Sequence, residues 1–238
     1  MPGLCGRWLR PIGSHTMRPG IRACIAVGIG LAGASVALAW SSKSFLPCEP
    51  VHQMAIENVL SNQVSPGFIA ILQNAQTVVD LDQQPTNSFE HSMTGIAAAG
   101  QTTNIETPIY LLETEEFIHT NLANAIRERE AGDTTNAFAS LGKAIHPLED
   151  ATSPEHKPFQ PWSYNESFWA EVYHVYHEHL YPDSTTDTNQ VEERAQLEGS
   201  VQYAYDIFMG KTNMPVQFFN HTNFLLDLPP AYLQRTNQ

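Results

Sequence analysis

Apolar residues recur at helical spacing through most of the chain beyond residue 50. Four apolar residues of the segment 49–62, Val51, Ala55, Ile56 and Leu60, share one helical face. A second stripe runs through residues 65–81, which open on a Ser-Pro helix start, and a third through residues 114–132, which close on a glycine. Strand-like alternation is nearly absent. The pattern predicts an all-α fold.

Three further segments extend this pattern. Residues 133–150 start at a candidate N-cap, Asp133. Residues 165–181 form an amphipathic and strongly aromatic stretch, and residues 188–210 form the last long helix. No internal repeat, low-complexity tract or linker divides the chain. We therefore expect a single-domain helical bundle over residues 40–238.

The N-terminal segment predicts a signal peptide over residues 1–39. Two arginines precede a run of apolar and small residues that closes on Ala37-Leu38-Ala39, a pattern typical of signal-peptidase sites. Met17 is an alternative start. A membrane anchor is the competing interpretation, but the apolar run contains glycines and a serine and is short for a span. We expect an exported protein, periplasmic or secreted, that begins at Trp40.

Cleavage there would make the chain strongly acidic. Four of the 12 Lys and Arg residues and none of the 25 Asp and Glu residues precede residue 40, so the formal charge becomes 8 − 25 = −17. This balance argues against a basic nucleic-acid groove and suits a protein that gathers cations, although a solvated acidic surface is the more common explanation. Only Cys48 would remain, which excludes a disulfide framework.

Histidines and acids are spaced for metal binding in two places. His146 and Asp150 are four residues apart, and so are His174 and Glu178, which places each pair on one helical face. His156 lies between the two pairs. Zn²⁺ favours histidine nitrogen and carboxylate oxygen. A single pair would usually be an ordinary polar surface, but the three elements together indicate a metal site.

The motifs "LGKAIHPLEDATSPEH" and "HVYHE" resemble the core of the zinc-dependent phospholipase C family. That family and the fungal single-strand nucleases have the same all-helical fold, which holds three zinc ions. Its hallmark is an N-terminal tryptophan that is freed by processing and chelates one zinc, and the cleavage site expected here exposes Trp40. One departure from the family is Pro147, which lies inside the stretch that is helical in the family. The loop between His156 and His174 also differs in length, which leaves the substrate open.

The resemblance implies nine metal ligands and three zinc ions. Asp80 and His91 match the family's aspartate and histidine, with Asp82 as a close competitor for the aspartate. By similarity, the first zinc takes Asp80, His91, His146 and Asp150. The second takes Trp40, His52 and Asp150, which bridges the two ions, and the third takes His156, His174 and Glu178. His119, in contrast, is interpreted as a helix histidine outside the site.

The resemblance also implies a reaction, hydrolysis of a phosphodiester by a metal-activated water with Asp80 as general base. Glu178 as the last ligand favours the phospholipase branch, with a phospholipid substrate and transient contact with a membrane surface. A single-strand nuclease of the same fold is the alternative, and only that alternative requires nucleic acid as a partner. A non-catalytic metal-binding helical module is a third interpretation. We expect a monomer in each case.

Overall fold

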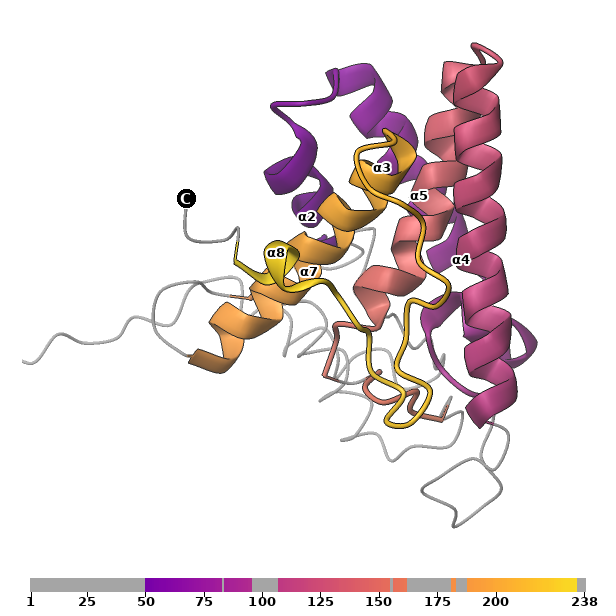
Figure 1. Cartoon of the computed structure of the whole chain (residues 1–238), viewed down its shortest axis with the longest axis vertical. Coiled ribbons are helices and arrows are strands. Elements are labelled where there is room, and N and C mark those ends of the chain that lie inside the picture. Colours follow the sequence, from indigo (N-terminus) through magenta and orange to yellow (C-terminus); the bar gives the residue numbers. More distant parts are fainter. Residues whose placement is uncertain are drawn as a thin grey trace, which may run out of the picture.

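The computed structural model describes residues 50–82, 84–95, 107–154, 156–161, 181–182 and 188–234. Its elements, in chain order, are α2 (Val51–Leu60), α3 (Pro66–Asp80), the 3-10 helix η1 (Pro85–His91), α4 (Thr107–Glu130), α5 (Thr134–Asp150), α7 (Thr188–Phe208) and α8 (Pro230–Leu233) (Figure 1). In these ranges there are two isolated β-bridges and no strand. The predicted all-α class is confirmed for the described part of the chain. None of its helices has the length and apolar character needed to cross a membrane.

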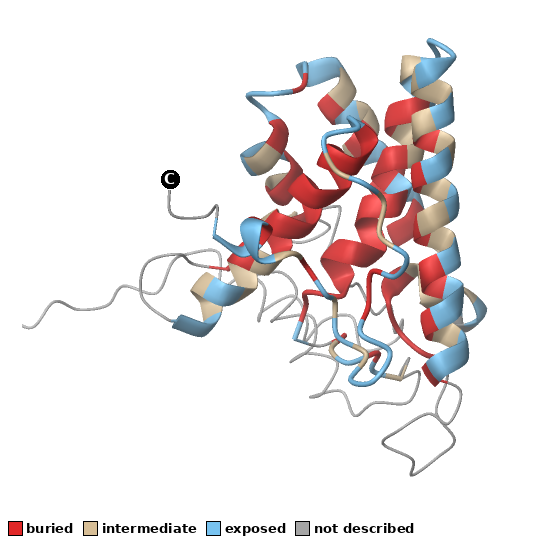
Figure 2. Ribbon diagram, viewed as in Figure 1, coloured by how far each residue is buried: buried red, intermediate tan, exposed pale blue. Residues whose placement is uncertain are grey.

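Helix α5 is the centre of the bundle. It packs against α4, α3 and α7, and Figure 1 shows α4 and α5 running side by side. Leu141, Ile145 and Leu148 of α5 are fully buried, as are Ile118 and Leu122 of α4. The buried sides of the helices face one another in Figure 2. Burial of such side chains contributes roughly 1.5–3 kcal/mol each, so this shared core is the main source of stability.

A short turn sets the antiparallel course of α4 and α5. Gly132 has a φ of +82°, a conformation that glycine adopts without strain. The next residue, Asp133, caps α5, because its side chain accepts a hydrogen bond from the backbone N–H of Asn136 at 3.3 Å. The predicted cap at Asp133 is confirmed.

The α3–α5 contact depends on a second glycine. A Cβ atom on Gly142 would lie 2.7 Å from the carbonyl oxygen of Leu72 and 2.9 Å from the Cβ of Ala75. Only a residue without a side chain lets the two backbones come this close. The close approach brings α3, which carries Gln76 and Asp80, against the helix that ends in His146 and Asp150.

The observed bounds follow the sequence prediction with one clear difference. Helix α4 starts at Thr107, seven residues before the predicted start at residue 114. Pro108 lies in its first turn, where a missing N–H costs the helix nothing. Helix α7 ends at Phe208, two residues before the predicted end. The predicted signal peptide (1–39) and all but the last residue of the predicted helix 165–181 lie outside the described residues.

Candidate metal centre

Five of the predicted ligands meet in the interior of the bundle. His52 lies in the first turn of α2, Asp80 is the last residue of α3, and His91 is the last residue of η1. His146 and Asp150 lie in the last turns of α5. All five are buried, with at most 5% of the residue surface exposed. Four elements of the fold, α2, α3, η1 and α5, therefore contribute to one buried cluster.

Their possible ligand atoms form two overlapping groups. One group contains His52, His146 and Asp150, and the other contains Asp80, His91 and His146. Within each group the nitrogen and oxygen atoms lie within 4.8 Å of one another. We call these five residues the metal cluster. Histidine and aspartate groups at these separations could bind a metal ion.

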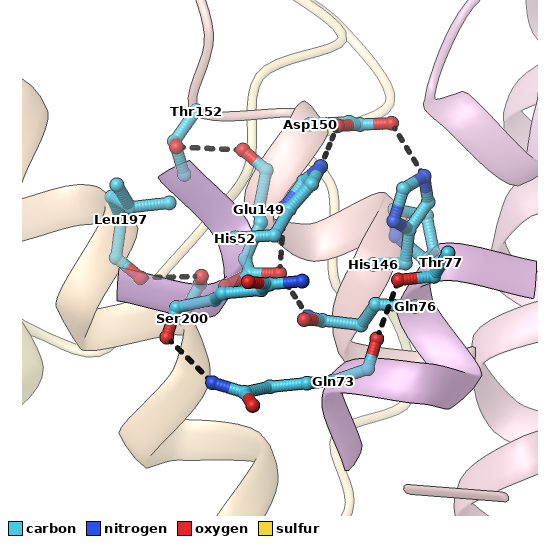
Figure 3. Close-up of polar contacts among 12 residues, drawn as sticks. His52, Gln73, Gln76, Thr77, His146, Glu149, Asp150, Thr152, Leu197 and Ser200 are labelled. Carbon is cyan, nitrogen blue, oxygen red and sulfur yellow. Dashed lines mark hydrogen bonds and ion pairs between the residues drawn. The ribbon is translucent and has the colours of Figure 1, made fainter. Parts of the chain in front are cut away.

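Asp150 is the central member of the metal cluster. Its Oδ1 lies 3.2 Å from His52 Nε2, and its Oδ2 lies 3.1 Å from His91 Nδ1 and 3.2 Å from His146 Nε2. The contacts to His52 and His146 are drawn in Figure 3. One carboxylate thus faces three imidazole rings, with an oxygen directed to each side.

Hydrogen bonds orient two of the three rings. His52 Nδ1 lies 2.9 Å from Glu149 Oε2, which leaves Nε2 on the side of Asp150. His91 Nε2 lies 3.2 Å from the backbone carbonyl oxygen of Asp82, which leaves Nδ1 on the side of Asp150. A histidine that binds metal through one nitrogen commonly donates a hydrogen bond through the other. His52 and His91 have this geometry.

Pro147 occupies the last turns of α5 rather than its start. It lacks an N–H, so it cannot complete the ordinary helical hydrogen bond to the carbonyl four residues earlier. Its own carbonyl oxygen accepts hydrogen bonds from the hydroxyl of Ser92 at 2.6 Å and from the backbone N–H of Ala151 at 3.0 Å. The Ser92 bond joins the residue after His91 to the residue after His146. It helps hold these two imidazoles together.

Burial and charge shift the proton affinities of the cluster in opposite directions. Burial lowers the pKa of the His146 imidazole to about 3, since nearby protonated histidines add to the effect and Asp150 only partly offsets it. Burial also acts to lower the pKa of His52, but the negative charges of Glu149 and Asp150, which both lie close to the ring, outweigh it and raise that pKa to about 10. Neighbouring imidazoles likewise outweigh burial at Asp150 and hold the pKa of its carboxyl well below its ordinary value. Asp150 is therefore ionised at neutral pH.

The cluster has the properties required of a cation site. Among the described residues, His52 Nε2, His146 Nδ1 and Asp150 Oδ1 are buried and make no hydrogen bond. Buried polar atoms are normally paired, so such atoms need an explanation. A divalent cation would satisfy His52 Nε2 and Asp150 Oδ1 together, because both belong to one group of possible ligand atoms. Nitrogen and carboxylate donors of this kind suit Zn²⁺.

The structure separates the two candidate aspartates. Asp80 is 5% exposed and belongs to one of the two groups of possible ligand atoms. The side chain of Asp82 instead accepts a hydrogen bond from Asn87 Nδ2 at 2.9 Å. Asp82 belongs to neither group, and its part near the cluster is the backbone carbonyl that faces His91. Of the two aspartates, it is Asp80 whose side chain lies at the cluster.

Only one residue of the third predicted zinc site, His156, lies within the described part of the chain. His156 is buried, and its Nδ1 lies 2.6 Å from the backbone carbonyl oxygen of His91. His156 belongs to neither group of possible ligand atoms. Its predicted partners, His174 and Glu178, lie outside the described residues, and so does Trp40. These four positions remain predictions.

Two residues beside the cluster were not singled out from the sequence. Glu149 is fully buried and accepts hydrogen bonds from His52 Nδ1 and from Gln76 Nε2 (Figure 3). Burial raises the pKa of its carboxyl to about 7, despite the opposing charge of His52. Only its position next to Asp150 in "HPLED" could have drawn attention to it. Gln76 had no distinguishing signal.

Other histidines stand apart from the cluster. His119 lies on α4, with Nδ1 3.0 Å from Met214 Sδ and Nε2 3.7 Å from Glu115 Oε2. It belongs to neither group of possible ligand atoms, in line with its interpretation as a helix histidine.

Comparison of the chain with protein-family models, with curated proteins and with solved structures found no match. The resemblance to the zinc-dependent phospholipase C family therefore rests on the motifs, and the metal centre rests on the geometry of the five clustered residues.

Proposed function

We propose that this chain is an exported zinc-dependent phosphodiesterase with phospholipase C-like activity on the head-group phosphodiester of a phospholipid. The observation that carries the proposal is the convergence of His52, Asp80, His91, His146 and Asp150. They were chosen from sequence motifs spread over about a hundred residues, yet their side chains form one buried cluster. A chance set of polar residues would be dispersed on the surface, since such side chains are mostly exposed.

The proposed zinc sites divide the cluster as the resemblance implies. Asp80, His91, His146 and Asp150 would hold one ion. His52 and Asp150, with the N-terminal Trp40, would hold a second. The position of Asp150 between His52 on one side and His91 and His146 on the other supports its bridging role. His156, His174 and Glu178 would hold the third ion.

Zinc ions bound here would supply Lewis-acid stabilisation of the phosphoryl oxygens and lower the pKa of a bound water. The protein would supply position and proton transfer. Asp80, at the end of α3, is proposed to accept the proton of the attacking water. Its carboxylate is already fixed at the cluster by its position at the end of a packed helix. Asp150 would keep the imidazoles of His91 and His146 oriented toward the same ion.

A lipid substrate is supported by exposed apolar residues on or beside α3, whose last residue is Asp80, and on α4. Val78 and Leu81, which lie close to Asp80 in sequence, are 54% and 59% exposed. Ile109 and Leu112, near the start of α4, are 57% and 58% exposed, and α4 packs against the η1 helix that carries His91. Large apolar side chains exposed beside a site suit contact with lipid. The acidic composition favours lipid over nucleic acid as well.

The decisive test combines metal analysis with two substrates. Protein exported from its host should start at Trp40 by mass spectrometry and contain close to three zincs. It should release a phosphorylated head group from phospholipid vesicles and leave single-stranded DNA intact. Cleavage of the DNA alone would support the nuclease instead. Stoichiometric zinc with neither activity would indicate a non-catalytic metal-binding module, and absence of zinc would contradict every form of the proposal.

Two neighbouring aspartates provide a matched pair for the proton-transfer role. Asp80→Asn should lower kcat by about 10²–10⁴-fold, the usual contribution of general acid–base catalysis. Asp82→Asn changes the same functional group two residues away, outside the cluster, and should leave kcat within about twofold. If Asp80→Asn retained zinc and full activity, Asp80 would not be the base.

A further inference from the structure

Glu149 is a buried carboxylate in the last turn of α5 that belongs to neither group of possible metal-ligand atoms. Its Oε2 accepts two hydrogen bonds, one from His52 Nδ1 at 2.9 Å and one from Gln76 Nε2. His52 comes from α2 and Gln76 from α3, so three helices meet at one oxygen atom. Figure 3 shows the side chains of Glu149 and Gln76 on one side of the His52 ring and Asp150 on the other.

The two nitrogens of an imidazole lie on different edges of the ring, so a bond at one decides what the other can do. With Nδ1 donating to Glu149, Nε2 carries the lone pair when the ring is neutral. That Nε2 lies 3.2 Å from Asp150 Oδ1 and makes no hydrogen bond among the described residues. The nitrogen available to a metal is therefore the one that faces the cluster.

We infer that Glu149, held by Gln76, is a positioning residue that fixes the tautomer and the orientation of His52 for metal binding. This inference rests on the proposed metal centre and adds a residue that the resemblance did not assign. A carboxylate behind a metal-binding histidine increases the basicity of the ring and restricts its rotation.

The three histidines of the cluster differ in this respect. His91 donates to a neutral backbone carbonyl, and His146 Nδ1 makes no hydrogen bond among the described residues. His52, in contrast, has the carboxylate of Glu149 at its second nitrogen. Hydrogen bonds to a charged acceptor are roughly twice as strong as neutral ones. The effect of removing Glu149 should therefore be confined to the ion that His52 binds.

The test measures Zn²⁺ affinity of the full chain by competition with a chelator, without reference to activity. Glu149→Leu removes the acceptor and should weaken binding of one zinc by about 10–100-fold, the usual cost of losing such a partner. Glu149→Gln keeps an oxygen that can accept both bonds and should lose about tenfold or less. Glu115→Gln is the matched control, because Glu115 is also a buried and hydrogen-bonded glutamate but lies outside the cluster.

Nitrogen-15 NMR of the zinc-loaded protein supplies a second measurement. In the wild type, the His52 Nδ1–H proton should be visible and protected from exchange. The Glu149→Leu change should abolish that signal and leave the His91 signals unchanged. A purely structural role of Glu149 would lower the melting temperature without changing zinc affinity or this resonance.

The possible failures can be told apart. If the wild type and Glu149→Leu bind zinc equally well, the inference is overturned and the metal centre stands. If Glu115→Gln weakens zinc binding as much as Glu149→Leu does, the effect is general and the inference is again overturned. If the wild type itself binds no zinc, the metal centre and the proposed function fall together with it.

Discussion

The buried carboxylates of Glu115 and Asp150 both lie near histidine side chains, but their hydrogen-bond partners differ in kind. Glu115 of α4 accepts hydrogen bonds from the backbone N–H of Phe218 at 2.8 and 2.9 Å and from that of Phe219 at 2.9 Å. His119 and His221 stand 3.7 Å from its two oxygens. Asp150 has three imidazole nitrogens within 3.2 Å, and its Oδ1 makes no hydrogen bond among the described residues.

The difference separates an anchor from a binding site. The backbone donors of Glu115 are fixed parts of the chain, so this carboxylate joins the segment around Phe218 to α4 and needs no further partner. The neighbours of Asp150 are imidazoles that can exchange a proton for a metal ion. A buried histidine and carboxylate side by side therefore indicate function only when their hydrogen-bonding capacity is left unfilled.

The variant Asp150→Asn should have the largest effect, and it tests whether Asp150 is a metal ligand. The change removes the charge that faces three imidazoles, those of His91 and His146 in the first proposed zinc site and that of His52 in the second, so both sites should fail. We expect affinity for these ions to fall by roughly 1,000-fold or more, beyond the 10–100-fold cost of losing a supporting residue. Metal analysis after dialysis measures this directly. Retention of three zincs would show that Asp150 is not a ligand.

Glu115→Ala tests the other side of the comparison. The change leaves the backbone N–H groups of Phe218 and Phe219 buried without their acceptor. Each unsatisfied group costs about 1–3 kcal/mol, so the free energy of unfolding should fall by about 2–6 kcal/mol. Urea denaturation measures the loss, and the zinc content of the folded protein should stay the same. Loss of zinc at unchanged stability would reverse the assignment of the two regions.

The pH dependence of zinc affinity tests the protonation states of the histidines around Asp150. The pKa of His52 is raised to about 10, so at neutral pH the metal-free ring holds a proton that a zinc ion must displace. Below pH 10 the affinity should therefore rise with pH, by about tenfold per pH unit for this one proton. The pKa of His146 is lowered to about 3, so this ring should add no slope between pH 6 and 8.

Calorimetry in buffers of different ionisation enthalpy counts the protons released. Release of about one proton per zinc at pH 7 is expected at the His52 site. A zinc affinity that does not change between pH 6 and 8 would contradict the protonated state of His52.

The smallest effect is expected at His119. His119→Gln removes an imidazole from beside Glu115 while the backbone donors of that carboxylate remain. Zinc content and affinity should change by less than about twofold, as for substitutions away from a site. The matched change His146→Gln should remove the ion shared with Asp80 and His91. Equal losses from the two variants would mean that the histidines do not separate into two classes.

Helical spacing was enough to predict most of the architecture. The segments 49–62, 65–81 and 133–150 contain α2, α3 and α5, because each segment has an apolar stripe at helical spacing. The early start of α4 was missed, since Pro108 marks a first helical turn only when the residues after it continue the helix. The apolar pattern of a segment therefore predicts the ends of its helix to within one or two turns.

The site was predictable only in part. His146 and Asp150 could be paired from their spacing. The sequence left the choice between Asp80 and Asp82 open, because packing against the rest of the fold decides which of two carboxylates near a helix end faces the cluster. The contact between Glu149 and His52 joins positions 97 residues apart, and nothing local announces it. Contacts of this kind follow from the close approach of helices at positions such as Gly142.

Zinc bound at the cluster would also act as a structural cross-link. Its five residues come from α2, α3, η1 and α5, so ions bound there would tie together four segments that the unfolded chain separates. Anything that binds only the folded state stabilises it by mass action, by about 2.7 kcal/mol at a hundred times Kd and about 1.4 kcal/mol more for each further tenfold rise in free ion. The lifetime of the folded protein would then follow the supply of zinc around it, so that scarcity of zinc would remove the folded protein as well as the proposed activity.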